Sequence, residues 1–359
     1  MQTISGARRR RYRKMDDKNE ALCIGIDLGT SRSSISASNG ERHVVDSYVG
    51  WPLDMVARKL TKKTVFIGHE ALENRSMLDL RRPLERGVIK EGSDKDEQAV
   101  RELLRHLVSL IGINQNRKDR TKIRAVVGVP AEAFRVSKQR LRGAMDGIAD
   151  SVMLVSEPFA VAYGLEALLH SVIIDIGAGT ADFCVMRGRY PTEQDQRTLP
   201  NAGDAIDEQL AKLIRERHPE VQFSIHMIRD WKEKWAFVGK PKRRVMVTAP
   251  VKGKASDLDI TDELRSACES ILPPICETML DLVANVEPEF QDKVRHKVIL
   301  AGGSSLISGL TDAIEKALLD VGGGRATVVK DPVFAGSDGG LAIARDASNS
   351  DWERLSAAA

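Results

Sequence analysis

Two stretches of the sequence carry the same order of residue types: a short apolar run, an aspartate, glycine with threonine, and a second apolar run. The first spans residues 23–34 around Asp27, and the second spans residues 172–183 around Asp175. Short apolar runs joined by a glycine turn are typical of a β-hairpin in a buried sheet. We therefore predict two equivalent hairpins, one from each half of an internally duplicated chain.

The residue types in these turns suit a ligand that carries phosphate. Glycines allow backbone N–H groups to approach a ligand closely, and successive N–H groups in a turn bind anions, with a neighbouring hydroxyl as a further donor. Asp27 or Asp175 would repel a polyphosphate unless a cation lay between them, and Mg²⁺ is commonly held by carboxylates, waters and phosphate oxygens. We expect Mg²⁺-nucleotide between the hairpins. The alternative, two ordinary glycine hairpins, is disfavoured by their matched pattern.

Length and composition describe a globular chain that is large enough for two domains. It has 359 residues, of which 29% are charged and 42% are apolar. No apolar run approaches the roughly 20 residues that span a bilayer, and the first residues are polar and basic, unlike a secretory signal. We expect a cytoplasmic protein without direct membrane insertion.

The net charge of +3 is small, but basic residues are concentrated at positions 8–14. Such a run could bind nucleic acid, anionic lipid or an acidic partner. We favour a disordered basic N-terminal tail over residues 1–20 that tunes association, and we do not expect nucleic acid as a partner.

A further carboxylate, Glu157, stands where a predicted strand gives way to a predicted helix. The strand covers residues 152–155, and Pro158 suits the first turn of the helix. In an open α/β sheet this junction faces the ligand crevice, where an unpaired carboxylate can orient or partly deprotonate a water. The alternative role, complementing the helix N-terminus, is weaker beside two phosphate-binding turns.

A later segment also has the features of a ligand-binding turn. Residues 297–301 form a predicted buried strand that leads into Gly302, Gly303 and Ser304. A strand, paired glycines, serines and then a helix can receive a sugar or phosphate at the helix N-terminus.

The rest of the chain alternates predicted strands and helices. Apolar periodicity predicts helices over residues 96–111, 131–148 and 227–238. Thr261 is predicted to cap a helix that runs through Val283, with an interruption at two prolines.

Taken in order, these segments resemble the actin/Hsp70/sugar-kinase superfamily over nearly all of residues 21–347. The two turns resemble its phosphate loops, residues 156–158 its connecting motif, and residues 301–304 its adenosine motif; Gly203 with Asp207 supplies a fifth motif. The resemblance implies an α/β, actin-like fold, with duplicated ribonuclease H-like domains around a nucleotide cleft that holds Mg-ATP.

The resemblance also implies how the chain divides into domains. The first domain would comprise residues 21–170 and about 331–347, with a small subdomain at about 43–118, and the second would comprise residues 171–330. A flexible C-terminal tail would follow at residues 348–359.

Within the superfamily, local stretches resemble bacterial actins of the MreB type and most closely those of the MamK type, the magnetosome-associated actins. These stretches are residues 76–84, 156–165, 216–220, 235–239 and 329–334. The resemblance implies a cytoskeletal ATPase that polymerises with ATP into cytoplasmic filaments of its own copies and disassembles after hydrolysis. It also implies that the filaments position magnetosome chains, with magnetosome-associated adaptor proteins as candidate partners.

The resemblance assigns roles residue by residue. Glu157 would polarise the attacking water, and Asp27 and Asp175 would hold the Mg²⁺ ion through its hydration shell, which makes Asp175 catalytic as well. The residues implied to contact ATP or ADP are Gly29, Thr30, Ser31, Gly177, Ala178, Gly179, Thr180, Gly203, Asp207, Lys232, Glu233, Gly302, Gly303 and Ser304.

Two features depart from the family pattern. Ala181 stands where a second threonine is common, so one hydroxyl contact to the ligand is expected to be lost while the backbone turn is retained. The arginine-rich extension is longer and more basic than expected, which suggests a divergent paralogue with altered assembly or partners.

Three other classes share the implied fold. An Hsp70-like ATPase would need a substrate-binding region after the nucleotide domain, and a sugar kinase would need a substrate base in the cleft and would not polymerise. A ParM-like segregation actin would bind a DNA-bound adaptor, which the basic run leaves open. A scaffold without ATPase activity is disfavoured because Asp27, Glu157 and Asp175 are all present.

Overall fold

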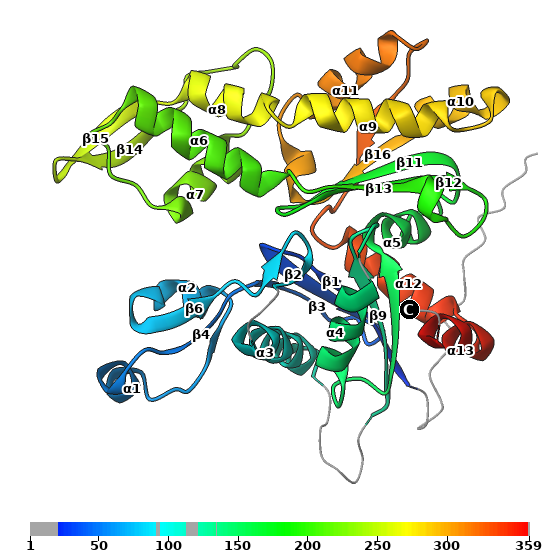
Figure 1. Ribbon diagram of the computed structural model, residues 1–359, viewed down its shortest axis with the longest axis horizontal. Coiled ribbons are helices and arrows are strands. Elements are labelled where there is room, and N and C mark those ends of the chain that lie inside the picture. Colours follow the sequence, from blue (N-terminus) through cyan, green and yellow to red (C-terminus); the bar gives the residue numbers. More distant parts are fainter. Residues whose placement is uncertain (1–20, 91–93, 113–120, 134, 358–359) are drawn as a thin grey trace, which may run out of the picture.

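The computed structural model describes residues 21–90, 94–112, 121–133 and 135–357. The expected basic tail over residues 1–20 lies outside the described residues. The described chain forms two five-stranded sheets, one in the lower and one in the upper half of Figure 1. None of its helices combines the length and the apolar character needed to cross a membrane.

The lower sheet is built around the first predicted hairpin. Its central strand pairs antiparallel with the second strand of the hairpin, which pairs antiparallel with a third, and two later strands add in parallel on the other side. In spatial order the strands are β3 (Arg42–Asp46), β2 (Arg32–Ala37), β1 (Leu22–Leu28), β9 (Ile123–Val129) and β10 (Ser151–Ser156).

The upper sheet repeats this arrangement around the second predicted hairpin. Two antiparallel pairs lie on one side of its central strand and two parallel pairs on the other. In spatial order the strands are β13 (Gln196–Leu199), β12 (Ala181–Arg187), β11 (Leu169–Ile176), β16 (Val298–Ala301) and β17 (Ala326–Val328). The identical order and direction of the strands confirm the predicted internal duplication.

Helix α3 (Asp94–Leu110) shows how the apolar pattern of the sequence produces the core. Its apolar residues recur three and four positions apart, and Leu103, Leu104 and Leu107 are completely buried. Acidic residues in its first turn complement the positive end of the helix dipole. With α4 (Arg135–Met145), this helix forms one core with the lower sheet.

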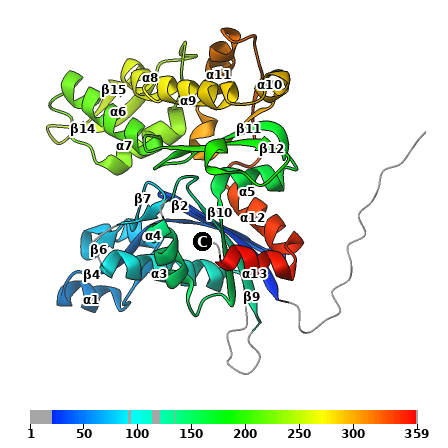
Figure 2. The same ribbon diagram turned by 45° about the vertical axis from the view of Figure 1, so that its right-hand side comes forward.

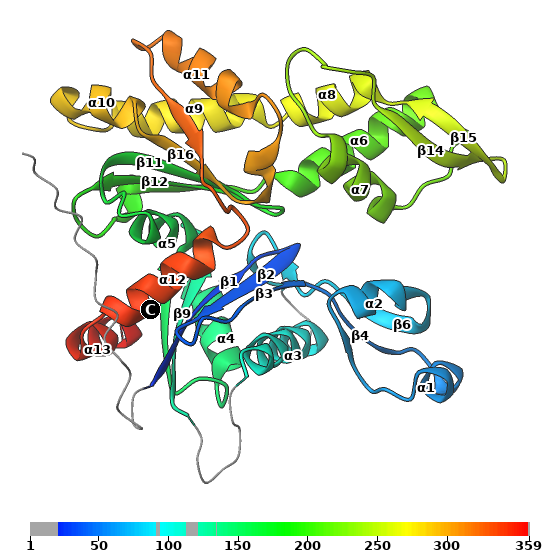
Figure 3. The same ribbon diagram turned by 180° about the vertical axis from the view of Figure 1, so that it is seen from behind.

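The two halves meet through α5 (Glu157–Gly164) and α12 (Ala335–Asp346). Figure 3, seen from behind, shows α12 running beside α5 and along β1. The approach is so close that a Cβ atom on Gly339 would lie 1.9 Å from the carbonyl oxygen of Ala160. Side chains from both sheets and both helices share one buried cluster, so a packed core holds the two sheets together.

The upper sheet packs against three further helices, which share a core with it. These are α9 (Leu272–Ala284), α10 (Pro288–Arg295) and α11 (Leu310–Leu319). Short 3₁₀ turns are found at η2 (Glu193–Asp195) and η3 (Gly303–Leu306), the latter directly after β16.

Two small units project from the sheets on the same side of the molecule (Figures 1 and 2). The lower one contains β4 (Val49–Pro52), α1 (Met55–Thr61), β5 (Phe66–Ile67), α2 (His69–Glu73), η1 (Arg75–Met77) and β6 (Leu78–Arg81), and is followed by the hairpin of β7 (Leu84–Glu85) and β8 (Val88–Ile89). The upper one contains α6 (Gly203–Arg217), α7 (Ile225–Trp235), β14 (Met246–Val251), β15 (Lys254–Asp259) and α8 (Thr261–Glu269).

The structure confirms one expectation about the segment from Thr261 to Val283 and corrects another. The predicted interruption near the two prolines is present, because the segment forms two helices, α8 and α9. Thr261 does not cap the first of them: its Oγ1 accepts a hydrogen bond from the N–H of Val245 at 2.8 Å. The chain breaks just before two prolines, which lack the N–H that would continue the helix and therefore sit in the first turn of α9.

The second correction concerns the C-terminal segment. The sequence predicts a flexible tail over residues 348–359, but residues Asn349–Ala357 form helix α13. Trp352 explains the difference because it is buried in the cluster between the two sheets, and the Arg124 guanidinium lies 5.6 Å from its ring centre. The other domain boundaries stay a prediction.

Candidate functional site

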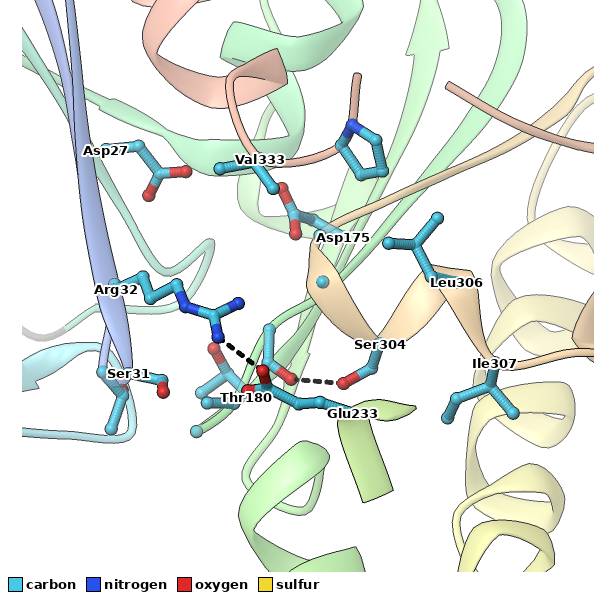
Figure 4. Close-up of a pocket in the computed structure, with 18 of the residues that line it drawn as sticks. Asp27, Ser31, Arg32, Asp175, Thr180, Glu233, Ser304, Leu306, Ile307 and Val333 are labelled. Atoms are coloured by element: carbon cyan, nitrogen blue, oxygen red, sulfur yellow. Dashed lines mark hydrogen bonds and ion pairs between the residues drawn. The ribbon is translucent and has the colours of Figure 1, made fainter. Parts of the chain in front are cut away.

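A cavity of about 450 Å³ lies between the two sheets, and both hairpin turns face it (Figure 4). The structure brings most of the predicted site residues to its wall. They are Asp27, Gly29, Thr30, Ser31, Glu157, Asp175, Gly177, Ala178, Gly179, Thr180, Lys232, Glu233, Gly302, Gly303 and Ser304. Gly203 and Asp207 are not among the lining residues.

The first turn, between β1 and β2, is anchored by the segments just before and just after the lower small unit. The Ser47 hydroxyl donates to the carbonyl of Gly29 at 2.6 Å. Arg82 Nε donates to the carbonyl of Thr30 at 2.9 Å, and the N–H of Gly87 donates to the Thr30 hydroxyl at 2.9 Å. These bonds fix the turn through two of its carbonyls and the Thr30 hydroxyl.

The second turn, between β11 and β12, is anchored by elements of the upper half. It closes on itself through the N–H of Gly177, which donates to the carbonyl of Thr180 at 2.9 Å. The Ser304 hydroxyl donates to the carbonyl of Gly177 at 3.0 Å, and the N–H of Asp204 in α6 donates to the carbonyl of Ala178 at 2.7 Å.

The two turns touch, and ion pairs join the units that anchor them. A Cβ atom on Gly179 would lie 2.5 Å from the Thr30 hydroxyl. The guanidinium of Arg82, which already holds Thr30, pairs with both carboxylate oxygens of Asp204 at 2.9 Å. Nearby, Arg229 in α7 donates to the Tyr48 hydroxyl at 2.6 Å. The cavity is therefore closed on this side by contacts between the halves.

Lys232 is held in place by the two predicted residues that do not line the cavity. Its ammonium group donates to the carbonyl of Gly203 at 2.6 Å and pairs with Asp207 at 2.6 Å. Burial raises the pKa of Asp207, and the charge of Lys232 opposes that rise. Gly203 and Asp207 thus position the Lys232 side chain without lining the cavity themselves.

Glu233 forms an ion pair across the cavity. Its carboxylate accepts from the guanidinium of Arg32 at 2.5 Å (Figure 4). The Arg32 guanidinium also lies 3.5 Å from the Asp46 carboxylate. Both side chains of the Arg32–Glu233 pair remain partly exposed, so this contact can exchange for a ligand at low cost.

Carboxylates are concentrated at the base of the cavity. Asp27 extends from β1 toward the side on which Asp175 lies (Figure 4). Burial, and then the charge of Asp182, raises the pKa of Asp27 to about 6; burial and the charges of Asp27 and Asp182 raise the pKa of Asp175 well above its usual value. Such clustered negative charge favours a bound cation.

The residues fit a hydrated magnesium ion. Among the described residues, no three His, Cys, Asp or Glu side chains are close enough to hold a metal directly. Mg²⁺ usually keeps several waters and takes one or two carboxylates plus substrate phosphates. Asp27 and Asp175 on opposite walls of one cavity can supply those carboxylates.

Glu157 lies at the junction of β10 and α5 and lines the same cavity. In the described part of the chain, its carboxylate makes no hydrogen bond or ion pair. Burial, followed by the charges of Asp27, Asp182 and Asp175, raises the pKa of Glu157 well above its usual value. A carboxylate with raised pKa and free oxygens can orient a water and take its proton.

The chain matches the family model described as MreB/Mbl protein over residues 21–349. It is 39% identical to the actin-like protein MamK of Paramagnetospirillum magneticum, over 93% of this chain and 95% of that protein. This chain belongs to the MreB/Mbl family. Within the family it is an actin-like protein of the MamK type.

Two solved structures of MamK are similar to this chain at 38% identity. A chain of the MamK double helical filament superposes with a TM-score of 0.88, covering 92% of this chain and all of that one. A non-polymerising MamK mutant bound to AMPPNP superposes with a TM-score of 0.69, covering 91% of this chain and all of that one. Identity and coverage are nearly equal, so the lower score reflects a different spatial arrangement of the same fold.

Sequence reasoning missed an apolar part of the cavity wall of this MreB/Mbl protein. Ala236, Leu306, Ile307 and Val333 line the cavity near the glycines that follow β16. Leu306 is 62% exposed although it is apolar, which suits the flat face of a base. The signal in the sequence was an apolar pair directly after the glycine–serine turn.

Sequence reasoning also missed the charged residues Arg32, Lys234 and Arg229, which line the cavity. Arg32 directly follows the first turn, which is a signal that could have been used. Arg229 and Lys234 belong to the α7 segment, where the sequence singled out only Lys232 and Glu233.

Ala181 does not occupy the place that the sequence suggested. It is completely buried in the core of the upper half and is not among the residues that line the cavity. Side chains alternate between the two faces of a strand, so a hydroxyl here would point into the core. The expectation of a lost ligand contact is therefore wrong.

Proposed function

We propose that this chain is a Mg²⁺-dependent ATPase that polymerises with ATP into filaments and disassembles after hydrolysis. The observation that carries the proposal is the meeting of two phosphate-type turns and Glu157 at one cavity. The MamK filament and the AMPPNP-bound MamK mutant support it by similarity. Family membership favours this class over the Hsp70-like and sugar-kinase classes.

In this proposal, each half of the molecule holds one side of the nucleotide. Backbone N–H groups of the turns around Thr30 and Thr180 would donate to the phosphates, and the apolar residues near Leu306 would contact the base. A bound Mg²⁺ would neutralise phosphate charge, with Asp27 and Asp175 holding its hydration shell.

Glu157 would act on the attacking water. Its free carboxylate oxygens would accept hydrogen bonds from a water in the cavity and orient it, and the raised pKa makes the carboxylate a stronger base. The proton of the water would pass to Glu157 as the water oxygen forms a bond to the terminal phosphorus. The bond from that phosphorus to the bridging oxygen would break, and ADP would leave with the bonding electron pair, which releases inorganic phosphate.

Hydrolysis would destabilise the filament by weakening the contacts that join the two turns. The Arg82–Asp204 pair links the unit that anchors the first turn to the helix that anchors the second. Loss of the terminal phosphate removes a group that both turns contact, so the closed arrangement becomes less favourable.

The cellular role is proposed from the relatives. Similarity to MamK suggests that the filaments organise magnetosome chains in the cytoplasm and associate with adaptor proteins there. Self-association would be the primary interaction.

Pelleting and phosphate release test the ATPase proposal. The wild type and Glu157→Gln are compared with ATP, ADP or no nucleotide, each with and without Mg²⁺. Glu208→Gln, an exposed residue on α6, is the matched control. We expect ATP-dependent polymer for all three proteins, and phosphate release that is slower in Glu157→Gln by roughly 10²–10⁴-fold, with longer-lived filaments.

Each other outcome removes part of the proposal. Equal phosphate release by the wild type and Glu157→Gln would exclude the water-orienting role. Monomer under all conditions would exclude a filament, and phosphate release only after a sugar is added would indicate a kinase.

A further inference from the structure

A second groove, of about 770 Å³, lies next to the nucleotide cavity. It is bordered by the segment between α7 and β14, residues 236–245, and by the starts of α9 and α11. A short paired segment separates it from the nucleotide cavity: Val238 donates to the carbonyl of Ser308 at 2.9 Å, and Ser308 donates to that of Ala236 at 3.2 Å. We call this second groove the basic groove, for the residues described below, and the proposed ATPase mechanism does not use it.

The basic groove carries an excess of positive charge. Glu269 and Asp312 are its acidic residues, and Glu269 is already engaged by the N–H of Gly239 at 3.0 Å. The cationic residues that line it are Lys234, Lys240, Lys242, Arg243 and Lys316. All five are exposed, and none forms an ion pair with an acid in the described part of the chain.

The walls of the groove add apolar and aromatic surface to this charge. The guanidinium of Arg243 lies 4.2 Å from the centre of the Trp235 ring, and the ammonium of Lys234 lies 5.1 Å from it. Leu272 and Ala313 are only partly buried and line the same groove. Cations beside an apolar wall suit a ligand that alternates carboxylates with apolar side chains.

The same features disfavour other anionic ligands. Two cations already lie against the Trp235 ring, so a nucleobase would have to displace them before it could stack there, as single-stranded nucleic acid would require. The chain's own N-terminal run at residues 8–14 is basic and would be repelled. We propose that the basic groove binds an acidic peptide segment of a partner protein, with its carboxylates on the lysines and an apolar side chain against Leu272.

The test uses full-length protein without nucleotide and a fluorescent synthetic peptide of alternating glutamate and leucine. The groove variant combines Lys240→Ala, Lys242→Ala and Lys316→Ala. The control variant combines Lys212→Ala, Lys254→Ala and Lys297→Ala, which removes three exposed lysines elsewhere that form no ion pair in the described part of the chain. A peptide with glutamine in place of glutamate is the ligand control.

We expect the wild type and the control variant to bind the glutamate peptide equally, and the groove variant to bind it about 10-fold more weakly or worse. Binding should weaken as salt is added, and the fluorescence of the wild type should shift on binding in a way that Trp235→Phe abolishes. These results would support the proposal whatever the outcome of the ATPase experiment, because no nucleotide is present.

Four results would overturn the proposal. The first two are equal binding of the glutamate peptide by the groove variant and the wild type, and equal binding of the glutamate and glutamine peptides by the wild type. The third is that single-stranded DNA or anionic vesicles compete more tightly than the glutamate peptide. The fourth is that no protein binds the peptide and that the groove variant alone loses self-association. The last would assign the groove to a second copy of this chain. Unchanged thermal unfolding of the groove variant is the check that it is folded.

Discussion

The two phosphate-type turns have the same strand topology but different anchors. Side chains of Ser47 and Arg82, together with the backbone of Gly87, hold the first turn, whereas Ser304 and the start of α6 hold the second. The fold was duplicated as a whole, but each copy was fixed by local residues of its own half. A ligand between the turns would therefore contact both halves, and the Arg82–Asp204 pair joins their anchors.

The hairpins also differ in the residue that pairs across from each aspartate. Asp27 pairs across its hairpin with Ser34, whereas Asp175 pairs with Asp182. Asp182 accepts from the N–H of Ala131 at 2.7 Å and from the Thr198 hydroxyl at 2.6 Å. The second hairpin thus contributes an extra acid that ties the upper sheet to the segment after β9. The two sheets therefore share one strand order, but only the second hairpin carries two paired carboxylates.

The largest expected effect comes from adding a methyl group beside Asp175, and a matched change can be made beside Asp27. At Gly302, φ is +75°, and a Cβ atom would lie 2.4 Å from Asp175 Oδ1 and 2.5 Å from the carbonyl of Ile176. Gly302→Ala should cost more than about 3 kcal/mol of unfolding free energy, through backbone strain and overpacking together. Chemical denaturation measures it.

The matched change in the first half is Gly336→Ala, where a Cβ atom would lie 2.6 Å from Asp27 Oδ2. This glycine is in helix α12, and the Asp27 carboxylate can rotate, so we expect a loss of about 1–2 kcal/mol. Equal destabilisation by both variants would contradict the expectation that backbone strain at Gly302 adds to the steric clash.

The extra acid of the second hairpin should make stability depend on pH. Burial raises the pKa of Asp182 from 3.8 to about 6. The folded chain then binds more protons than the unfolded chain between these values, so the unfolding free energy falls as pH rises from about 4 to 6. The shift corresponds to about 3 kcal/mol at most.

Asp182→Asn removes this titration, because asparagine does not titrate, and it also removes the charge that raises the pKa of Asp27, Asp175 and Glu157. Both effects act in the same direction on the difference between the two proteins. We expect the stability of the wild type relative to Asp182→Asn, measured without Mg²⁺ or nucleotide, to decrease between pH 4 and 6. Parallel curves for the two proteins would show that Asp182 titrates normally. Ser34→Ala in the first hairpin should leave the pH dependence unchanged.

The contact between the two anchoring units should have a smaller effect. In a double-mutant cycle, Arg82→Ala and Asp204→Ala should show a coupling of about 1–2 kcal/mol in nucleotide binding, because the pair is bidentate and only partly exposed. Additive losses would mean that the two turns bind nucleotide without help from this pair. Arg105→Ala with Glu102→Ala, an exposed pair within α3, is the control.

The smallest expected effect is that of Ala181→Thr on activity. Because Ala181 faces the core and not the cavity, restoring the family threonine should change phosphate release by less than about twofold. A large gain in phosphate release would show that the residue reaches the ligand after all.

The sequence was most informative where function depends on short-range patterns. The two turns, Glu157 and the glycine–serine turn after β16 each lie within a few residues of a strand end, so local pattern placed them at the cavity. The pairs Arg82–Asp204 and Arg229–Tyr48 join residues more than a hundred positions apart. No local pattern encodes such partners.

The C-terminal segment shows both a missed local signal and a tertiary contact. The N–H of Ser348 donates to the Asp351 carboxylate at 3.1 Å, and the N–H of Asp351 donates to the Ser348 hydroxyl at 3.2 Å, at the start of α13. A capping box of this kind can be read from a sequence, whereas the burial of Trp352 against the rest of the fold cannot. The position of Lys232 in front of Asp207 likewise depends on the packing of α7 on α6, and a nucleotide contact of Asp207 stays a prediction.

The most direct test of the account is the Mg²⁺ dependence of AMPPNP binding by the wild type, Asp27→Asn and Asp175→Asn. The account holds that one nucleotide lies between the two hairpins, with one aspartate from each facing the metal. It predicts one site per chain, tighter binding with Mg²⁺ in the wild type, and loss of most of that tightening in either variant. Full Mg²⁺ dependence in either variant, or two independent sites per chain, would contradict it.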